Sequence, residues 1–186
     1  MVTSQMRILS HTNELLHSLS YRISQCIIDP GDEWDGFVGV DAVLLTHGHF
    51  DHIYGLNKLM EMNPDAVVYT NEAGREALLD ARKNMSHYHE SPFVFAFPDQ
   101  ILIVGDGESI ELGNGIVAEA HFTPGHNPSC ITWIVDDAVF SGDALIPGIK
   151  TVTNLPGSSK PLSVKSEELI KKLAEGKKIF PGHKIV

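Results

Sequence analysis

Short apolar runs alternate with helical patterns in the first half of the chain. Residues 41–46 and 66–70 are apolar runs of the length and composition of buried strands. Between them, apolar side chains recur every three or four positions over residues 53–60, the spacing of one helix face. Asn71, a good N-cap residue, begins a second helical pattern that extends to Ala81. The first half therefore predicts the order strand, helix, strand, helix.

The second half is richer in strand patterns. An Asn114-Gly115 pair is typical of a hairpin turn, and Asp136-Asp137 separates a second pair of apolar runs. The predicted strands cover residues 101–104, 109–112, 116–122, 131–135, 138–140 and 178–180. A last helix is predicted from Ser166, with Glu167 and Glu168 in its first turn, to Gly176.

These elements predict an α+β fold in which two sheets pack together and helices cover their outer faces. The chain has no internal repeat, no low-complexity tract and no linker between two apolar blocks. We therefore expect one catalytic domain over residues 1–186.

Composition narrows the class of protein. The chain has 186 residues, 42% of them hydrophobic, which is enough for one sizeable core. Its net charge is -10 without a long run of one sign, so nucleic acid is not an expected partner. No segment has the length and apolarity of a signal peptide or a membrane helix, which predicts a cytoplasmic protein without a membrane partner. Cys26 and Cys130 lack the spacing of a thiolate zinc site.

The 10 histidines bring in candidate metal chemistry, because imidazole is the commonest metal ligand. Residues 46–52 read Thr-His-Gly-His-Phe-Asp-His, directly after a predicted buried strand. On extended backbone, His47, His49 and Asp51 point to one side, while His52 points elsewhere and can reach a second metal. Random placement of the same residues gives about 0.002 such patterns per chain. A solvated or capping histidine loop is the alternative interpretation.

Three further motifs follow predicted strands, and each contains a glycine that lets the backbone approach a site closely. They are Thr123-Pro124-Gly125-His126, Ser141-Gly142-Asp143 and Phe180-Pro181-Gly182-His183. Alone, each is typical of a turn. With the first cluster they supply five histidines and two aspartates, enough ligands for two metals with positions open to water or substrate.

These motifs, in this order, resemble those of the metallo-β-lactamase fold superfamily, and Cys26 to Gly31 resembles its early Ile-Asp-x-Gly strand end. The resemblance implies an αβ/βα sandwich of four layers with two divalent metals at one edge. We expect zinc, although iron and manganese accept the same ligands. The implied ligands are His47, His49 and His126 for one metal, Asp51, His52 and His183 for the other, and a bridging Asp143.

Within the superfamily, the chain is most similar to the glyoxalase II-like, hydroxyacylglutathione-hydrolase-type branch. The similarity includes the hairpin over residues 106–113 and the Asn84-Met85-Ser86 sequence. It implies a thioester or a related small ester as substrate and a metal-bridging hydroxide as nucleophile. Asp51 would be the catalytic residue that orients this hydroxide and passes its proton to the leaving group.

Several interpretations stay open. The candidate substrate-binding residues are Asn84, His87 and Lys150, and Asp29 either orients a metal ligand or caps a turn. A persulfide dioxygenase-like oxidoreductase with one iron, a lactonase or β-lactam hydrolase of the same fold, and a binding module without activity are the alternative functions. The oligomeric state is not predicted.

Overall fold

Two mixed sheets lie face to face in the computed structural model, which describes residues 6–184. The first sheet has the order β1-β2-β3-β4-β5-β6. Its strands are β1 (Ile8–Thr12), β2 (Leu19–Ile23), β3 (Cys26–Ile28), β4 (Ala42–Leu44), β5 (Val67–Thr70) and β6 (Ile101–Ile103). Pairing is antiparallel from β1 to β3 and parallel from β3 to β6.

The second sheet has the order β11-β10-β9-β8-β7. Its strands are β7 (Ser109–Glu111), β8 (Val117–Phe122), β9 (Ile131–Val135), β10 (Ala138–Gly142) and β11 (Lys178–Pro181). Neighbours are antiparallel except for β10 and β11, which are parallel. That parallel pairing sets the residues after β10 beside those after β11.

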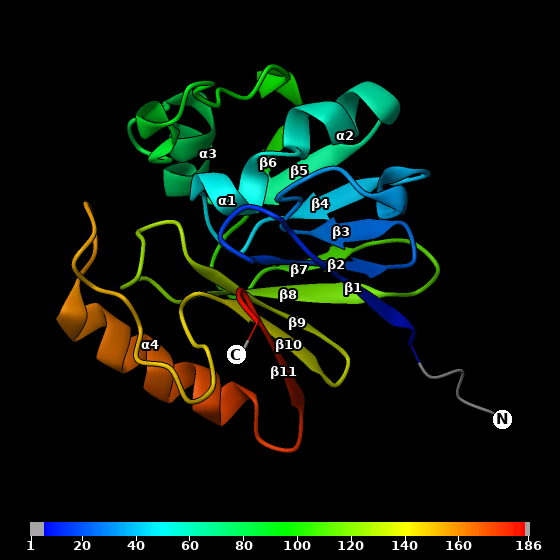
Figure 1. Ribbon diagram of the computed structural model, residues 1–186. Coiled ribbons are helices and arrows are strands. Elements are labelled where there is room, and N and C mark those ends of the chain that lie inside the picture. The colour runs from blue at the N-terminus through cyan, green and yellow to red at the C-terminus, as the bar shows by residue number, and fades with distance from the viewer. Residues whose placement is uncertain (1–5, 185–186) are drawn as a thin grey trace, which may run out of the picture.

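Helices cover the outer faces of both sheets, so the molecule has four layers (Figure 1). The helices α1 (Phe50–Ile53), α2 (Leu56–Met62) and α3 (Glu72–Leu79) lie over the first sheet, and α4 (Lys160–Leu173) lies over the second. Short 3-10 helices occupy Asp35–Phe37, Ser86–Tyr88 and Pro98–Gln100. The expected αβ/βα sandwich is confirmed.

The apolar core is divided by these layers. Trp133 and Phe140 are fully buried between the two sheets, and Leu56 and Leu59 are fully buried between α2 and the first sheet. Ile170 of α4 packs against the outer face of the second sheet. The apolar faces of the sheets and helices are thereby buried away from water. This burial of apolar surface is the main favourable term in the free energy of folding.

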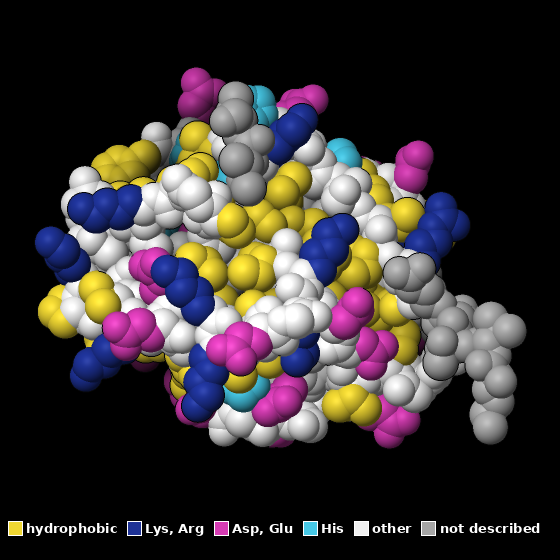
Figure 2. Space-filling view, turned by 90° about the horizontal axis from the view of Figure 1, so that it is seen from below, with side chains coloured by type: hydrophobic (Ala, Val, Ile, Leu, Met, Phe, Trp, Pro, Cys, Tyr) yellow, Lys and Arg dark blue, Asp and Glu magenta, His cyan; other side chains and the backbone are white. Residues whose placement is uncertain are grey.

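The face that carries α4 is seen from below in Figure 2, where hydrophobic side chains lie between scattered lysines, arginines and acidic residues. One ion pair on α4 joins Lys171 to Glu167 at 2.6 Å. Basic and acidic side chains are therefore mixed on this face. Among the described residues, no helix is long and apolar enough to cross a membrane.

The predicted start of the last helix at Ser166 is wrong, since α4 begins at Lys160. Pro161 suits the first turn of a helix, where its missing N–H costs nothing. The buried face of this first part is made of small polar residues, Ser163 and Ser166, rather than apolar ones. A search for apolar side chains at helical spacing therefore could not detect the first turns of α4. Strands β1 and β2 were not predicted, and the exposed, polar positions of β1 explain this for an edge strand.

Candidate metal centre

The predicted ligands come from four loops at one edge of the sandwich. Each loop follows a strand: the His47 to His52 loop follows β4, and the others follow β8, β10 and β11. Parallel pairing of β10 with β11 sets Asp143 beside His183. All seven predicted ligands are thereby brought together, although they span more than a hundred residues of sequence.

The first histidine loop is fixed to the second sheet by backbone hydrogen bonds. Ile131 donates its N–H to the Thr46 carbonyl at 2.7 Å, and the Trp133 indole donates to the Leu45 carbonyl at 2.9 Å. Gly48 donates its N–H to the Ser129 hydroxyl at 2.9 Å. The loop, which follows a strand of the first sheet, is therefore held against residues 129–133 of the second.

His47, His49 and His126 form the first ligand cluster. One nitrogen from each lies within 4.8 Å of the others, and all three side chains are buried. His49 Nδ1 and His126 Nε2 are 3.0 Å apart. The structure thus groups these three histidines as the family resemblance implies, whereas the spacing argument had placed Asp51 with His47 and His49.

Asp51, His52 and His183 form the second cluster. His52 Nε2 lies 3.4 Å from Asp51 Oδ2 and 3.3 Å from His183 Nε2. His183 Nε2 lies 3.3 Å from Asp51 Oδ2. Two ligands at zinc-bonding distance from one tetrahedral ion are about 3.3 Å apart, so these separations fit a metal.

Asp143 lies between the two clusters. Its Oδ2 is 3.5 Å from His126 Nε2 and 3.3 Å from His183 Nε2, while its Oδ1 is 3.6 Å from His52 Nε2. One carboxylate therefore faces ligands of both clusters. This is the position from which a carboxylate can bridge two cations.

The ring nitrogens that point away from the centre are each tied by a hydrogen bond. His52 and His183 donate through Nδ1 to Asp29 and to the Leu16 carbonyl, at 3.0 and 3.1 Å. His126 donates through Nδ1 to the Val152 carbonyl at 3.0 Å. His49 has the opposite orientation, with Nε2 hydrogen-bonded to the Asn127 amide at 2.9 Å and Nδ1 toward the centre. Such partners fix the ring orientation that a metal requires.

Two buried polar atoms of the centre have no hydrogen-bond partner within residues 6–184. They are His47 Nε2 and Asp143 Oδ1. An unpaired buried polar atom costs free energy, so such atoms call for a ligand. With the ligand separations above, these orphaned atoms show that the residues fit divalent metals.

Protonation differs between the clusters. Burial lowers the pKa of His47 well below its ordinary value, lowers that of His49 to about 4, and also lowers that of His126. The neighbouring histidines add to the effect on His47 and His49. These three imidazoles are therefore neutral near pH 7, the form that binds a metal.

The second cluster holds protons instead. Burial alone would lower the pKa of His52 and His183, but the carboxylates of Asp51 and Asp143 outweigh it and raise these pKa values to about 9 and about 10. Burial would raise the pKa of both aspartates, yet the facing histidines, His52 foremost, hold each below its usual value. Both carboxylates are thus ionised at neutral pH.

Asp29, which sequence left between two roles, orients a predicted ligand. It accepts from the backbone N–H of Thr46 at 2.7 Å and from His52 Nδ1 at 3.0 Å, and it also accepts from the Thr46 hydroxyl. Its side chain is buried. These bonds occupy its oxygens, so we take it as a support for His52 although it also lies near His47.

The candidate substrate-binding residues lie apart from one another. Asn84 is fully buried, and its amide donates to the carbonyls of Ala77 and Phe93. His87 is exposed and its ring contacts that of Tyr88 at a tilt of 40°, whereas Lys150 lines a separate pocket with Glu167 and Lys171. Their role in substrate binding stays a prediction.

Asn127 was missed by sequence reasoning. Its amide contacts His49 Nε2, and its carbonyl oxygen accepts from the N–H and hydroxyl of Ser129. The only signal was its position next to His126, which does not distinguish it from a turn residue.

Comparison with known proteins agrees with this geometry. A family model described as the metallo-beta-lactamase superfamily matches residues 38–183. The probable metallo-hydrolase YqgX of Bacillus subtilis (strain 168) is 36% identical over 172 residues, covering 86% of this chain and 80% of that protein. A hydroxyacylglutathione hydrolase of Xylella fastidiosa (strain M12) is 35% identical over 104 residues, 56% of this chain and 32% of its own length. The chain thus aligns with about a third of that hydrolase.

Solved structures share the fold. The BLEG-1 B3 metallo-beta-lactamase superposes with a TM-score of 0.82 at 23% identity, covering 96% of this chain and 92% of that one. TTHA1623, solved in a di-iron-bound form, gives a TM-score of 0.80 at 24% identity, covering 95% and 92%. At these identities the likeness concerns the architecture alone.

Proposed function

The chain belongs to the metallo-β-lactamase superfamily, and we propose that it is a cytoplasmic binuclear zinc hydrolase that cleaves a small thioester. The observation that carries the proposal is the position of Asp143, which faces His126 of one cluster and His52 and His183 of the other. Two complete clusters that share a carboxylate suit two cations better than one.

Divalent metals bound here would supply a water of lowered pKa, near 7, and would polarise the carbonyl group of the substrate. In the hydrolysis, the water oxygen bonds to the carbonyl carbon and the carbon–sulfur bond breaks, giving a carboxylic acid and a thiol. The chain then needs no serine or cysteine nucleophile. Cys26 and Cys130 are buried, and burial raises the pKa of both thiols, which suits them to no such role.

Asp51 is the residue we assign to proton movement. Its Oδ2 lies 3.3 Å from His183 Nε2 and 3.4 Å from His52 Nε2, and its carboxylate is ionised because its pKa is lowered. An ionised carboxylate at this position can accept a proton from the attacking water and return it to the departing sulfur. Asp29 and Asn127 position the rings of His52 and His49.

Two observations favour a thioester over other substrates. The aligned Xylella fastidiosa relative is a hydroxyacylglutathione hydrolase, and its similarity includes over half of this chain. A thiolate is also a good leaving group, so the site needs no strong acid beside the sulfur. Lactones and β-lactams are the alternatives within the same fold.

Metal quantification followed by a hydrolysis panel tests the proposal. We expect about two zinc ions per chain after purification without chelators, and hydrolysis of thioesters in preference to lactones, β-lactams and phosphodiesters. Asp51→Ala should abolish turnover. One iron per chain with oxygen consumption on a persulfide would replace the proposal by the dioxygenase alternative, and absence of any transition metal would overturn it.

A further inference from the structure

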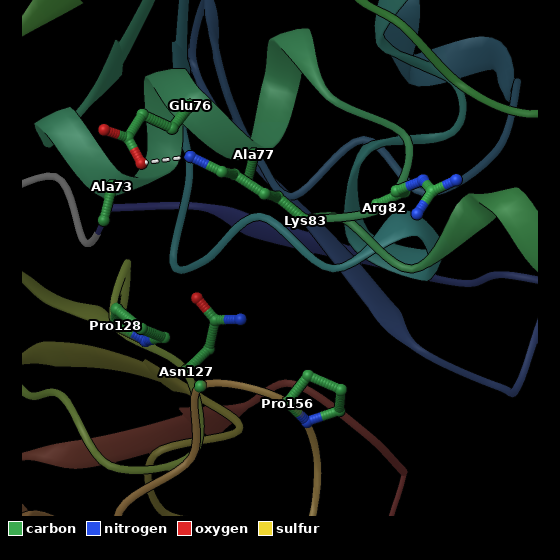
Figure 3. Close-up of a pocket in the computed structure, with 9 residues that line it drawn as sticks. Ala73, Glu76, Ala77, Arg82, Lys83, Asn127, Pro128 and Pro156 are labelled. Atoms are coloured by element: carbon green, nitrogen blue, oxygen red, sulfur yellow. Dashed lines mark hydrogen bonds and ion pairs between the residues drawn. The ribbon is translucent and has the colours of Figure 1, made fainter.

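A pocket of about 340 Å³ opens between α3 and two loops of the second half of the chain. Figure 3 shows its two walls, with residues of α3 and the following loop on one side and of the 127–128 and 156–157 loops on the other. Its lining comprises Ala73, Glu76, Ala77, Arg82, Lys83, Asn127, Pro128, Pro156 and Gly157.

The pocket adjoins the metal centre at two places. Asn127 lines it, and the amide of the same residue lies 2.9 Å from His49 Nε2. On the opposite wall, the loop that carries Arg82 and Lys83 continues to Asn84, whose carbonyl accepts the N–H of Phe50 at 2.9 Å. Residues of the pocket are therefore next to the metal-binding loop on both walls.

The lining is apolar at its walls and charged at its rim. Alanines and prolines form the walls, and these side chains lose little conformational entropy when a ligand covers them. At the rim, Lys83 Nζ and Glu76 Oε2 are 2.6 Å apart and neutralise each other. No hydrogen bond or ion pair among residues 6–184 involves the Arg82 guanidinium, although its backbone N–H bonds to Asp80. Arg82 is thus the cation of this rim left for a ligand.

Arginine suits one class of ligand group in particular. Its planar guanidinium donates two parallel hydrogen bonds to a carboxylate, which a lysine ammonium cannot do. The pocket volume corresponds to about 11 waters of 30 Å³ each, so it holds a short chain rather than a large cofactor. A short apolar chain with a terminal carboxylate matches both the walls and the rim.

We propose that this pocket is the specificity subsite of the hydrolase and takes a carboxylate-bearing arm of the thioester, with Arg82 as the group that contacts the carboxylate. The inference rests on the proposed thioester hydrolysis. From the metal centre, the arm would pass around the His49 ring to its Nε2 side, where Asn127 lies, and then between Pro128 and Ala77 toward Arg82.

A matched series of thioacetates tests the subsite. In each pair the S-alkyl chain ends in a methyl or in a carboxylate, and the chain length increases along the series. The specificity ratio is kcat/KM for the carboxylate divided by kcat/KM for the neutral partner. We expect a ratio above one at an optimal length in the native enzyme, and a fall of that ratio by about tenfold in Arg82→Ala. The loss should lie mainly in KM.

Arg75→Ala is the matched control, because Arg75 is also exposed but does not line the pocket. It should leave the ratio as in the native enzyme. Ala73→Trp, which fills the pocket from the wall formed by α3, should lower the ratio as Arg82→Ala does. Equal ratios in the native enzyme and Arg82→Ala, or equal losses in Arg82→Ala and Arg75→Ala, would overturn the proposal.

Direct binding separates this proposal from the proposed function. Calorimetric titration with glutarate measures carboxylate binding in the metal-loaded protein without any turnover. Weaker binding in Arg82→Ala than in Arg75→Ala would support the subsite even if no thioester were hydrolysed, and that result would remove only the thioesterase assignment. Hydrolysis of thioesters with glutarate binding that is unaffected by Arg82→Ala would remove only the subsite.

Discussion

The carboxylate of Asp29 holds His52 by its Nδ1 atom at 3.0 Å, which turns His52 Nε2 toward Asp51 and Asp143. This contact joins the end of β3 to α1. The same carboxylate accepts from Thr46, at the start of the first histidine loop. One side chain therefore sets both the loop and the orientation of a predicted ligand.

Asp29→Asn should weaken metal binding at the second cluster. The amide NH2 group places a donor where an acceptor is needed, while asparagine tolerates the positive φ of 52° at this position. We expect metal affinity to fall about 10–100-fold and the stoichiometry to drop from two toward one. Metal analysis after dialysis checks this. Asp32→Asn, whose partners are His11 and Glu14, is the control and should retain both metals.

Chelation should destabilise the protein. Metals bind the folded clusters and not the unfolded chain, and a metal present at 100 times its Kd contributes about 2.7 kcal/mol. For a chain of this size, that corresponds to a fall in Tm of about 5–10 °C on treatment with EDTA. Calorimetry with and without added zinc measures it. An unchanged Tm would contradict metal binding to the native clusters.

Loading of the two clusters should differ in proton release. Because the pKa values of His52 and His183 are raised to about 9 and about 10, both are protonated near pH 7 before metal binds, and filling the second cluster displaces about two protons. Its affinity should rise with pH up to about 10, where His183 also loses its proton. The first cluster should release none, because burial lowers the pKa of its histidines, and it should hold its metal down to about pH 5. Calorimetry in buffers of different ionisation enthalpy distinguishes the two. Equal proton release from both sites would argue against these charge states.

Gly182→Ala should displace Asp143. A Cβ at position 182 would overlap Asp143 Oδ1 and would lie in tight contact with His52 Cε1, at 3.0 Å. The bridging carboxylate must move, so we expect loss of the second metal and a fall in kcat of about 100-fold or more. Gly105→Ala is the control for glycine loss itself, since Gly105 is exposed, has no positive φ, and its Cβ would meet only Glu108 Oε2, at 3.4 Å. Full metal content in Gly182→Ala would refute the expected crowding.

Trp133→Phe should lower stability at the join between the sheets. It removes the indole N–H that donates to the Leu45 carbonyl and leaves a cavity in the core. We expect the free energy of unfolding to fall by roughly 2–4 kcal/mol. Trp34→Phe should cost less, because Trp34 is only partly buried and its indole nitrogen has no partner among the described residues. Urea unfolding of both variants provides the comparison. Equal costs would mean that the bond to Leu45 adds nothing.

The sequence predicted those features that depend on the spacing of residues along the chain. His47 and His49 lie two apart on extended backbone and share a cluster, and the glycines next to His126, Asp143 and His183 predict close approach to a common site. The expected continuation of that alternation to Asp51 is wrong, because α1 begins at Phe50 and turns Asp51 toward His52 and His183. Strands with continuous apolar runs, such as β4 and β9, were also predicted. These features are local, so a linear pattern contains them.

The features that the sequence did not predict depend on contacts between residues far apart in the chain. Asn127 supports His49 because the loop after β8 packs against the loop after β4, and the sequence spacing does not predict that contact. The start of α4 was missed because Ser163, a small polar residue, packs against the backbone at Gly125. Arg82 carries no motif at all. Its proposed role follows from its position in a pocket that it lines together with residues 127–128 and 156–157.

His183 and His52 are 131 residues apart in the chain, so the two ligand clusters are completed one after the other during synthesis. During synthesis from the N-terminus, the first cluster has all its histidines once His126 has been made, whereas the second must wait for β11 to pair with β10. A nascent chain can therefore hold a complete first cluster while the second still lacks His183. Completion of the second cluster then depends on the pairing of β11 with β10.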